Sequence, residues 1–382
     1  MSAAWPSVAL GEVLTQDTQY VHTLEPRQYP KLSVKLYGRG VVLDSPADGG
    51  TVKMQKHQFA RRGQVILSEI WAKKGAIGVV PPEGDGALCT SHFFLFDINR
   101  DKALPEFIAW LLSGNYLEPQ LNSEARGTTG YAAIRPKQFL ATSIPLPPLD
   151  EQRRIVARIE ELAAKVNEAH KLRNESKKAT SAFISATHAE LSVSPPQPLS
   201  NFIELYEDEV PIVMGMPYSQ AGVRGFGGGL FAKPPVYGGQ TTYRAFNRLY
   251  SGALVMSQVK GWEGAVAMTP RELEGYFVSP EYRTFRCKDN RCLPEYLAAL
   301  VPTEFFWSRL KDATRGVGAR RERTRPEQFL QLQFSMPSLA DQKRAITMFA
   351  NISAVQTLQT RTAAELNAML PAIIDKAFNG GL

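Results

Sequence analysis

Apolar residues recur at a helical spacing in the middle of the chain. Five of them follow one another at intervals of four, three, four and three residues: Ile155, Ile159, Leu162, Val166 and Ala169. Arg, Lys and Glu fill most positions between them, as in a helix whose apolar stripe packs against another helix. The pattern starts after the proline-rich stretch "PLPPL" and stops before "SVSPPQP", which predicts a helix over residues 149–191 that is roughly 60 Å long.

A second apolar stripe lies near the end of the sequence, at Ile346, Phe349, Ile352, Val355, Leu358, Leu366, Leu370 and Ile373. Ser338, followed three residues later by Asp341, is typical of a capping box, so we expect this helix to begin near Leu339. Pro371 should kink it, because proline lacks the amide hydrogen that a helix interior needs. The simplest partner for each stripe is the other one, in an antiparallel coiled coil. The alternative is that each helix packs on its own globular domain.

The chain repeats itself over the length of a whole domain. "VKLYGRGVV" begins at Val34 and its match "VRGFGGGLF" at Val223. "GQVILSEIWAKKGAIGVV" begins at Gly63 and its match "GALVMSQVKGWEGAVAMT" at Gly252, so the offset between the copies is the same. After one inserted residue, "RPKQFL" matches "RPEQFL", and the two proline-led helices follow in that new register. Because the period is far longer than that of a solenoid, each copy is a domain with its helix.

Each copy has the texture of a mixed α/β domain. Segments rich in β-branched and aromatic residues, such as "GQVILSEI" and "HFFLFDI", are strand-length and bounded by Gly, Pro and Asp, while "LPEFIAWLLSGNYL" predicts a short helix. We therefore expect an α+β protein in which two similar globular domains alternate with two long helices under pseudo-twofold symmetry. The expected boundaries are 1–148 and 192–337 for the globular domains, and 149–191 and 338–382 for the helices.

Length and composition limit the class of protein. A chain of 382 residues, 44% of them hydrophobic, is too long for one ordinary core. It contains no apolar run long enough to cross a membrane, and its start lacks the blocks of a signal peptide, so we expect a cytoplasmic protein. Cys89, Cys287 and Cys292 are too few for a structural zinc site, and the histidines lack ligand spacing, so neither a disulfide framework nor a metal is expected. The net charge of +7 favours a polyanionic partner, although many proteins with no such partner carry as much.

The starts and ends of the predicted helices resemble a known family. "PLPPLDEQRRIVARIEEL", its echo "MPSLADQKRAITMF" and the ending "LPAIIDKAFNGGL" are similar to the specificity subunit of type I restriction-modification enzymes, over nearly the whole chain. The echo departs from the pattern, with Ser338 and Ala340 where the first copy has Pro148 and Asp150. The resemblance implies two target recognition domains that each read half of a bipartite DNA target, and two helices that set the spacer. It implies double-stranded DNA, two methylation subunits and, through them, restriction subunits as partners.

Candidate DNA contacts gather in equivalent segments of the two copies. Arginine forks fit phosphates and guanine edges, and glycines let the backbone approach a surface. The stretch before the second helix contains Arg315, Arg320, Arg321, Arg323 and Arg325. Its equivalent in the first copy contains Arg126, Thr128, Thr129, Tyr131 and Arg135. A turn between strands contains Lys73 and Lys74 in one copy, and Lys260 and Trp262 in the other. A glycine-rich turn contains Lys35, Tyr37 and Arg39, with Arg224 opposite them. For every group, a solvated loop or an ordinary turn is the alternative.

The sequence carries no motif of a self-sufficient enzyme. An adenine methyltransferase needs an Asn-Pro-Pro-Tyr type motif, and in "AKPPVY" no Asn or Asp precedes Pro234. A phosphate-binding loop of the form G-x-x-x-x-G-K-[ST] is also absent. We expect a non-catalytic DNA-recognition subunit without a cofactor. The alternatives are a non-catalytic scaffold of a related phage-defence complex, and an enzyme with an unrecognised site.

Two further expectations follow from the repeat and the resemblance. Because the two copies align through strands, loops and helix, we expect related half-sites that approach an inverted repeat. The segments that differ, "EIWAKKGA" against "QVKGWEGA" and "RGTTGYAAIRP" against "RGVGARRERTRP", are candidates for base discrimination. Charged residues on the outer faces of the helices are candidates for docking methylation subunits: Arg153, Arg154, Lys343 and Arg344.

Overall fold

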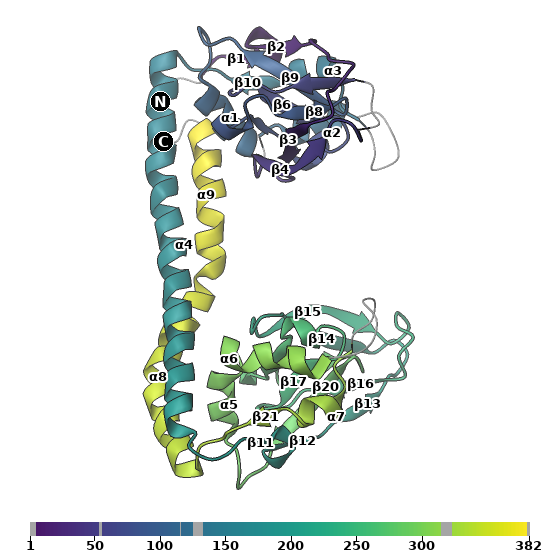
Figure 1. Ribbon diagram of the computed structural model, residues 1–382, viewed down its shortest axis with the longest axis vertical. Coiled ribbons are helices and arrows are strands. Elements are labelled where there is room, and N and C mark those ends of the chain that lie inside the picture. The colour runs from purple at the N-terminus through teal and green to yellow at the C-terminus, as the bar shows by residue number, and fades with distance from the viewer. Residues whose placement is uncertain (1–4, 53–55, 115, 125–132, 315–322, 380–382) are drawn as a thin grey trace. The chain divides into compact units, whose positions relative to one another are not determined.

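The structure is a computed structural model that describes residues 5–52, 56–114, 116–124, 133–314 and 323–379 (Figure 1). Its contacts divide the chain into two units, Met1–His170 with Ala363–Leu382 (unit 1) and Lys171–Thr362 (unit 2). The boundary falls inside the longest helix, α4 (Leu149–Leu191), and between the last two helices, α8 (Leu339–Arg361) and α9 (Ala363–Phe378). Each unit therefore combines a globular part with segments of both helical regions.

The globular part of unit 1 contains two four-stranded sheets. The first has the order β2-β9-β6-β7 and is antiparallel throughout. The second has the order β4-β3-β8-β5, in which β3 and β8 are parallel. A short pair, β1 with β10, lies beside the start of α4. The strands are β1 (Ser7–Ala9), β2 (Leu14–Asp17), β3 (Gln28–Val34), β4 (Val41–Asp48), β5 (His57–Phe59), β6 (Val65–Ser68), β7 (Ile77–Val79), β8 (Leu88–Thr90), β9 (Phe93–Ile98) and β10 (Ser143–Pro145).

Short helices connect these strands and cover the first sheet. They are α1 (Pro105–Ser113), α2 (Glu118–Glu124) and α3 (Pro136–Leu140), with the 3-10 turns η1 (Leu10–Glu12), η2 (Ala72–Lys74) and η3 (Pro82–Gly84). The short helix predicted over residues 104–117 is present as α1, which ends at Ser113, and α2 begins just after the predicted segment. The mixed α/β class predicted from the sequence is confirmed. Within the part of the chain that the structure describes, no helix has the length and apolar character needed to cross a membrane.

The globular part of unit 2 has the same topology. Its four-stranded sheet has the order β12-β20-β17-β18, and β17, like β6, is buried along its whole length. Its other sheet has five strands, β13-β16-β19-β14-β15, because the isolated Val21–His57 bridge of unit 1 becomes the strand pair around Val210 and Phe246. The repeat seen in the sequence is therefore a repeat of structure within each unit.

The elements of unit 2 are as follows. The strands are β11 (Gln197–Pro198), β12 (Ile203–Leu205), β13 (Glu209–Pro211), β14 (Pro217–Val223), β15 (Leu230–Tyr237), β16 (Ala245–Arg248), β17 (Leu254–Ser257), β18 (Val266–Met268), β19 (Phe277–Val278), β20 (Tyr282–Cys287) and β21 (Gln333–Phe334). The helices and turns are α5 (Pro294–Leu300), α6 (Glu304–Trp307), α7 (Pro326–Leu330), η4 (Leu199–Asn201), η5 (Gly261–Glu263), η6 (Arg271–Leu273) and η7 (Ser308–Thr314).

In unit 1, the first half of α4 and α9 share a core with the globular part. Ile155 and Ile159 of α4 are at most 1% exposed and belong to the same apolar cluster as Phe107 of α1. Ile374 and Phe378 of α9 belong to this cluster as well. Burying the heptad stripe removes it from water, which is the main stabilising contribution that such residues make. The apolar stripe predicted for 149–169 therefore faces both a helix and a globular domain.

In unit 2, the second half of α4 lies beside α8 and runs antiparallel to it (Figure 1). Arg173 donates a hydrogen bond of 2.7 Å from Nη2 to Oγ1 of Thr362, at the far end of α8. Further along α4, the ring of Phe183 lies 6.2 Å from that of Phe349. Since the partner residue moves backward as α4 advances, the two segments are antiparallel.

A buried glutamine fixes the start of each helical region to its globular part. Gln152, which is fully buried, accepts a hydrogen bond from the Leu104 N–H (2.8 Å) and donates to the carbonyl oxygens of Lys102 (2.9 Å) and Pro147 (2.8 Å). Gln342, its equivalent in the second copy, makes the three corresponding hydrogen bonds at 2.9, 3.0 and 2.9 Å. This explains the glutamine in the motif that follows the prolines: it satisfies backbone groups that would otherwise be buried without partners.

The ends of α4 and α9 occupy equivalent places in the two units. In unit 1, the rings of Phe378 and Phe107 lie 5.2 Å apart. In unit 2, their equivalents are His188 and Tyr296, and His188 Nδ1 is 2.7 Å from the Tyr296 hydroxyl. Burial lowers the pKa of His188 to about 4, with a smaller contribution from the positive charge of Arg309. The core of each globular part is therefore completed by the end of the helical region that follows the other copy. This is α9 in unit 1 and the end of α4 in unit 2.

The second helical region differs from its prediction. It is interrupted at Thr362, whereas Pro371 lies inside α9. The Thr362 hydroxyl donates to the Leu358 carbonyl (3.0 Å), and such a bond to the preceding turn bends helices. The predicted apolar stripe is also wrong at Val355 and Leu358, which are 51% and 61% exposed, because this stretch meets α4 through polar hydrogen bonds.

Candidate nucleic-acid interface

Two of the predicted segments lie against each other in the first copy. The Tyr37 N–H donates to the Lys74 carbonyl (2.6 Å), and the Gly38 N–H donates to the Gly75 carbonyl (3.0 Å). Gly75 has φ 70°, and a Cβ there would lie 2.8 Å from the Gly38 nitrogen, so a side chain would separate the two turns. The structure thereby joins the two groups of candidates, Lys35, Tyr37 and Arg39 with Lys73 and Lys74, on one exposed edge.

The second copy repeats this contact. The Phe226 N–H donates to the Glu263 carbonyl (2.7 Å), and the Gly227 N–H points at the Gly264 carbonyl (3.5 Å). All four residues stand at the positions that the repeat makes equivalent to those of the first copy. The paired turns carry the predicted residues Arg224, Lys260 and Trp262. Since backbone groups make the contact, it survives the change of side chains between the copies.

An aromatic residue in the left-handed conformation stands at the tip of each glycine-rich turn. Tyr37 (φ 61°) and Phe226 (φ 54°) are the non-glycine residues with positive φ in the described ranges, and they are equivalent in the repeat. Both are well exposed, at 66% and 62%. Strain of this kind persists only where the surroundings enforce it, and it gathers at functional sites. Tyr37 is among the residues predicted from the sequence and Phe226 is not, although the alignment of "LYGRG" with "GFGGG" contains the signal.

The third predicted segment packs beside the same turns. The Ile134 N–H donates to the Glu69 carbonyl (3.0 Å), and its equivalent, the Thr324 N–H, donates to the Gln258 carbonyl (2.9 Å). Thr324 also lies close against Gly261, the first residue of η5, where a side chain would meet its hydroxyl. Arg135, Arg323 and Arg325 are therefore neighbours of the paired turns. The structure brings all three predicted groups together in each copy, as far as their residues are described.

The cationic side chains of this edge differ in their partners. Arg135 Nη1 lies 2.5 Å from Glu69 Oε1, and Arg323 Nη2 lies 2.9 Å from Glu281 Oε1. Lys260 lies 3.7 Å from the Glu263 carboxylate. These side chains remain about half exposed or more, at 66%, 53% and 61%. They are therefore accessible to a ligand although each has a carboxylate beside it.

Aromatic rings lie beside two further cations of this edge. The Lys74 ammonium lies 5.0 Å from the ring centre of Trp71, and the Arg224 guanidinium lies 4.3 Å from that of Phe231. Trp262 is 45% exposed, so it is not part of the core. Seven predicted residues lie outside the described residues: Arg126, Thr128, Thr129, Tyr131, Arg315, Arg320 and Arg321.

An open cavity lies behind each pair of turns. In unit 1, a cavity of about 780 Å³ is lined by Tyr37, by Trp110 of α1 and by α9. In unit 2, a cavity of about 450 Å³ is lined by Phe226, by Trp307 of α6 and by the second half of α4. The two cavities are equivalent in the repeat. Tyr37 and Phe226, at the tips of the glycine-rich turns, each line one of them.

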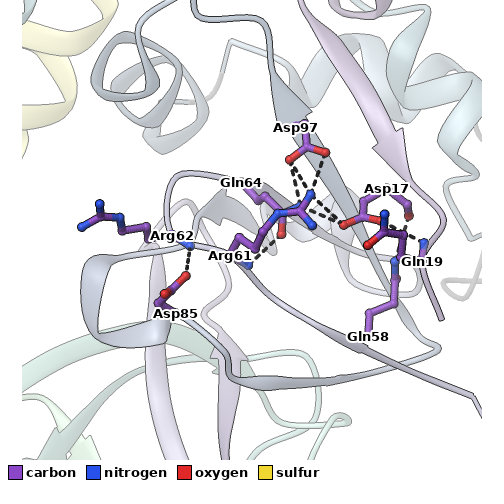
Figure 2. A network of polar contacts seen from close by, with 8 residues as sticks. All are labelled: Asp17, Gln19, Gln58, Arg61, Arg62, Gln64, Asp85 and Asp97. Carbon is purple, nitrogen blue, oxygen red and sulfur yellow. Dashed lines mark hydrogen bonds and ion pairs between the residues drawn. The ribbon is translucent and has the colours of Figure 1, made fainter. Parts of the chain in front are cut away.

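A polar network that the sequence analysis missed lies at the other end of β6, around Arg61 (Figure 2). The Arg61 guanidinium bridges Asp97 (2.8 Å) and Asp17 (3.1 Å), and Gln64 Nε2 donates to both carboxylates at 3.0 Å. The hydrogen bond to Asp97 raises the pKa of Arg61. Asp17 is buried, and its charge is balanced here, so we interpret the network as a clamp between β2, β9 and the start of β6.

The second copy replaces this clamp with aromatic rings. Tyr206 stands in the place of Asp17 and Tyr250 in that of Arg61, and their rings meet edge to face at 5.4 Å. Arg286, in the place of Asp97, pairs with Glu204 at 2.5 Å and lies over the Tyr206 ring. The clamp is thus specific to one copy, unlike the paired turns, which both copies keep.

The described residues offer no grouping of three His, Cys, Asp or Glu side chains that could hold a metal ion. Burial raises the pKa of Cys89 to about 12, which keeps this thiol protonated. What the structure brings together is a set of exposed cations, aromatic rings and backbone turns. Such groups bind nucleic acids through phosphates, base edges and stacking.

Two α/β units of one topology, each with a basic and aromatic edge built from the same turns, define a duplicated binding protein. Residues 4–177 match the family model described as the type I restriction modification DNA specificity domain. The resemblance to the specificity subunit, predicted from the sequence, is thereby confirmed. The second copy is related to the first through the internal repeat.

Solved structures of this class cover almost the whole chain. A chain from a structure of an assembled type I R-M system is 23% identical and has a TM-score of 0.63, with 99% of this chain and 98% of that chain covered. The HsdS subunit from Thermoanaerobacter tengcongensis is 24% identical (TM-score 0.49; coverage 99% and 97%). The S subunit from M. genitalium is 14% identical (TM-score 0.46; coverage 98% and 96%). The first of these likenesses shows a shared fold. No curated protein sequence matches the chain.

Proposed function

We propose that this chain is the sequence-specific DNA-recognition subunit of a type I restriction-modification complex. Each globular part reads one half of a bipartite target, and separate subunits methylate adenine or cleave the DNA. The observation that carries the proposal is the repeated edge: the same backbone contacts join the equivalent turns of both copies. Both copies keep the paired turns, whereas only the first copy has the Arg61 clamp. We take this difference as a sign that function constrains the paired turns.

The domain organisation is part of this proposal. The target recognition domains are 1–148 and 192–337, and the spacer helices are 149–191 and 338–382. We infer that the helices pair along their length as an antiparallel coiled coil and hold the two recognition domains under pseudo-twofold symmetry. The antiparallel contacts of α8 with α4 inside unit 2 support this, as does the equivalence of Phe378 and His188. A rigid spacer would fix the separation of the half-sites on the duplex.

We assign the DNA contacts to the repeated edge and to the seven predicted residues that lie outside the described ranges. In the first copy they are Lys35, Tyr37, Arg39, Lys73, Lys74, Arg126, Thr128, Thr129, Tyr131 and Arg135. In the second copy they are Arg224, Lys260, Trp262, Arg315, Arg320, Arg321, Arg323 and Arg325, and we add Phe226 because it is exposed and equivalent to Tyr37. Lysines on the turns would neutralise phosphates, while the arginines and exposed aromatic residues would meet phosphates or bases.

Methylation subunits are the proposed partners of the helices. Arg154 and Arg344 are equivalent in the repeat, and each forms an ion pair with an acidic residue three positions earlier, Glu151 at 2.7 Å and Asp341 at 3.0 Å. Such exposed pairs contribute little to stability. Their repetition on both helices supports two equivalent docking faces, together with Arg153 and Lys343. The likeness to a chain from an assembled type I R-M system supports the same expectation. Restriction subunits would join through the methylation subunits.

A mobility-shift measurement with random duplex DNA tests the proposal. We expect binding by the full chain, alone or with its methylation subunits, that weakens steeply as salt rises, because bound cations release counterions from the phosphates. Binding that ignores salt, or no binding, would favour a protein-only scaffold of a defence complex. Cleavage or methylation of DNA by the purified chain alone would favour an enzyme with an unrecognised site.

Methylation in the source cell gives an independent test. Deleting the gene should remove N6-methyladenine from one split motif and leave other motifs unchanged. The two halves of that motif should be related, since the two recognition domains are. A methylome that stays the same in a cell whose partner subunits are active would contradict the proposal.

A further inference from the structure

We propose that each recognition domain discriminates a guanine through one arginine held by a carboxylate, and that this arginine sits at different positions in the two copies. In the first copy it is Arg135, held by Glu69, and in the second it is Arg323, held by Glu281. The inference rests on the proposed function, because it assigns base-reading roles within the same DNA-binding edge. It distinguishes two residues from the other candidates that share that edge.

In the first copy, the carboxylate is a fixed anchor. The Glu69 backbone is held on both sides, since its carbonyl accepts from Ile134 N–H (3.0 Å) and its N–H donates to the His92 carbonyl (2.8 Å). Its side chain is only 15% exposed, whereas that of Arg135 is 66% exposed. The pair thus joins a nearly buried acceptor to an outward-reaching guanidinium, at 2.5 Å between Nη1 and Oε1.

In the second copy, the carboxylate stands at another position, just before β20 instead of just after the equivalent of β6. Gln258 stands where the first copy has Glu69, and Arg325 stands where it has Arg135. The acid is now Glu281, the equivalent of His92, and it pairs with Arg323 at 2.9 Å. Glu281 is 30% exposed, and its Oε2 is buried without a hydrogen-bond partner among the described residues, so this acid can accept a further N–H from the guanidinium.

The unpaired arginine provides the contrast. Arg325 is exposed, and the structure gives its side chain no ion pair with any described residue. An arginine free to rotate can follow a phosphate but loses side-chain entropy when it must present its fork to one base. An arginine already oriented by a carboxylate loses less, and its planar fork matches the O6 and N7 atoms of guanine. The carboxylate also disfavours a phosphate at the same place by charge repulsion.

Stability of the fold does not account for these pairs, since ion pairs exposed to this degree contribute little. Yet each copy has built one, with a different acid and a different arginine. Arg323 lies two residues before the position equivalent to Arg135, which is roughly 6–7 Å in extended backbone. The discriminated base pair should therefore shift by one or two steps between half-sites, because successive base pairs are about 3.4 Å apart. The half-sites are then related without being inverted copies.

Selection of bound duplexes from a random pool tests the assignment. The full chain, in complex with its methylation subunits, is compared with Arg135→Lys, Arg323→Lys and Arg325→Lys. Lysine keeps the charge and removes the bidentate fork. We expect Arg135→Lys to reduce discrimination at one base pair of one half-site by about 10- to 100-fold. Arg323→Lys should do the same in the other half-site, at a position displaced by one or two base pairs. Arg325→Lys tests an arginine of the same edge that we expect to follow a phosphate, so it should change the affinity for every duplex alike and leave the base preferences of the motif as they are.

Glu69 is a positioning residue in this scheme. Glu69→Gln keeps the shape of the side chain and should weaken discrimination at the same base pair that Arg135→Lys affects, with little change in the melting temperature. A residue with a merely structural role would lower affinity for every sequence alike. Gln258→Glu is the reciprocal variant, and it should sharpen discrimination at a new position by orienting Arg325.

The outcomes separate this inference from the proposed function. If the wild type selects a split motif, and Arg135→Lys and Arg323→Lys select the same motif with equal discrimination, the inference is wrong and the function stands. If Arg325→Lys alone changes the motif, the assignment of the reading arginine in the second copy is wrong. If the wild-type complex selects no DNA, both the function and the inference are overturned.

Discussion

His188 occupies the place in unit 2 that Phe378 occupies in unit 1. The His188–Tyr296 contact therefore responds to acid, whereas the Phe378–Phe107 contact does not. An unfolded histidine has a pKa near 6.5, whereas burial lowers that of His188 to about 4. Between these values the unfolded chain binds a proton that the folded unit does not. Stability is therefore complete above pH 6.5 and falls as the pH drops toward 4, by at most about 1.4 kcal/mol per pH unit from this residue.

The double variant His188→Phe with Tyr296→Phe should remove this dependence, because it reproduces the Phe378–Phe107 contact of unit 1. Urea unfolding at pH 7, 6 and 5 measures the effect. We expect the free energy of unfolding of unit 2 to fall more steeply with acid in the wild type than in the variant. Equal slopes would show that His188 binds its proton over the same pH range in the folded and the unfolded protein.

The clamp around Arg61 allows a second test on single residues. Asp17 accepts hydrogen bonds from Gln64 and from the Gln19 N–H (2.9 Å), besides its ion pair with Arg61. Asp17→Ala leaves these buried donors without an acceptor, so we expect a loss of about 1–3 kcal/mol in the free energy of unfolding. Asp44→Ala, which removes an exposed partner of Lys31, is the control and should change stability little. Similar losses for both would mean that the clamp is not a buried network.

For single residues, the sequence predicted equivalent positions wherever the repeat aligned the two copies. An equal offset marks equal backbone, which is why equivalent turns could be identified in both copies, and the contact of these turns with DNA stays a prediction. The Arg61 clamp was missed because Asp17 and Gln64 are far apart in the chain and meet only when β2, β9 and β6 are assembled. The partners of Arg135 and Arg323 were missed for the same reason.

Gln152 attaches the start of α4 to the globular part of unit 1, and Gln342 attaches the start of α8 to that of unit 2. Gln152→Leu should leave one N–H and two carbonyls of unit 1 without partners, which costs about 3 kcal/mol or more in stability. Gln342→Leu should have the same effect on unit 2 alone. Calorimetry that resolves the two transitions measures this. If both variants lower one common transition equally, the two units unfold together.

Long elements were predicted well, and their interruptions were not. The heptad period of residues 149–191 dominates its sequence, and the helix is confirmed over that range as α4. The start of α8 is also confirmed, with Ser338 Oγ accepting from the Asp341 N–H at 3.2 Å. The break at Thr362 depends on one hydroxyl and one arginine from another helix, which no period reveals. The 3-10 turns are likewise too short to carry a pattern.

For the whole molecule, we predict that the length of the proposed spacer helices sets the number of base pairs between the two half-sites. Deleting seven residues from α4 and seven from the region of α8 and α9, in register, keeps the apolar seam and shortens the rod by about 10 Å. We expect the permitted spacer to shorten by about three base pairs, since base pairs are about 3.4 Å apart, with both half-sites unchanged. Selection from random duplexes measures it. Changed half-sites with the old spacer would contradict this prediction.

The repeat predicts two domains and two long helices, but which segments make up each unit could not be read from the sequence. Unit 1 includes the segment after Thr362, and unit 2 includes the second half of α4. Which apolar stripe closes which core depends on contacts such as that of Phe107 with Phe378, which stand far apart in the chain. Heptad spacing gives every stripe the same appearance.

Because unit 1 contains residues from both ends of the chain, the division into units sets the order in which the units can complete their folding during synthesis. Domains usually mature from the N-terminus onward during synthesis. Here unit 2 is continuous in the chain, whereas unit 1 must wait for the segment that carries Ile374 and Phe378. Nascent chains that stop just after Thr362 would therefore hold a complete later unit and an earlier one with an open apolar face, a state that chaperones and proteases recognise.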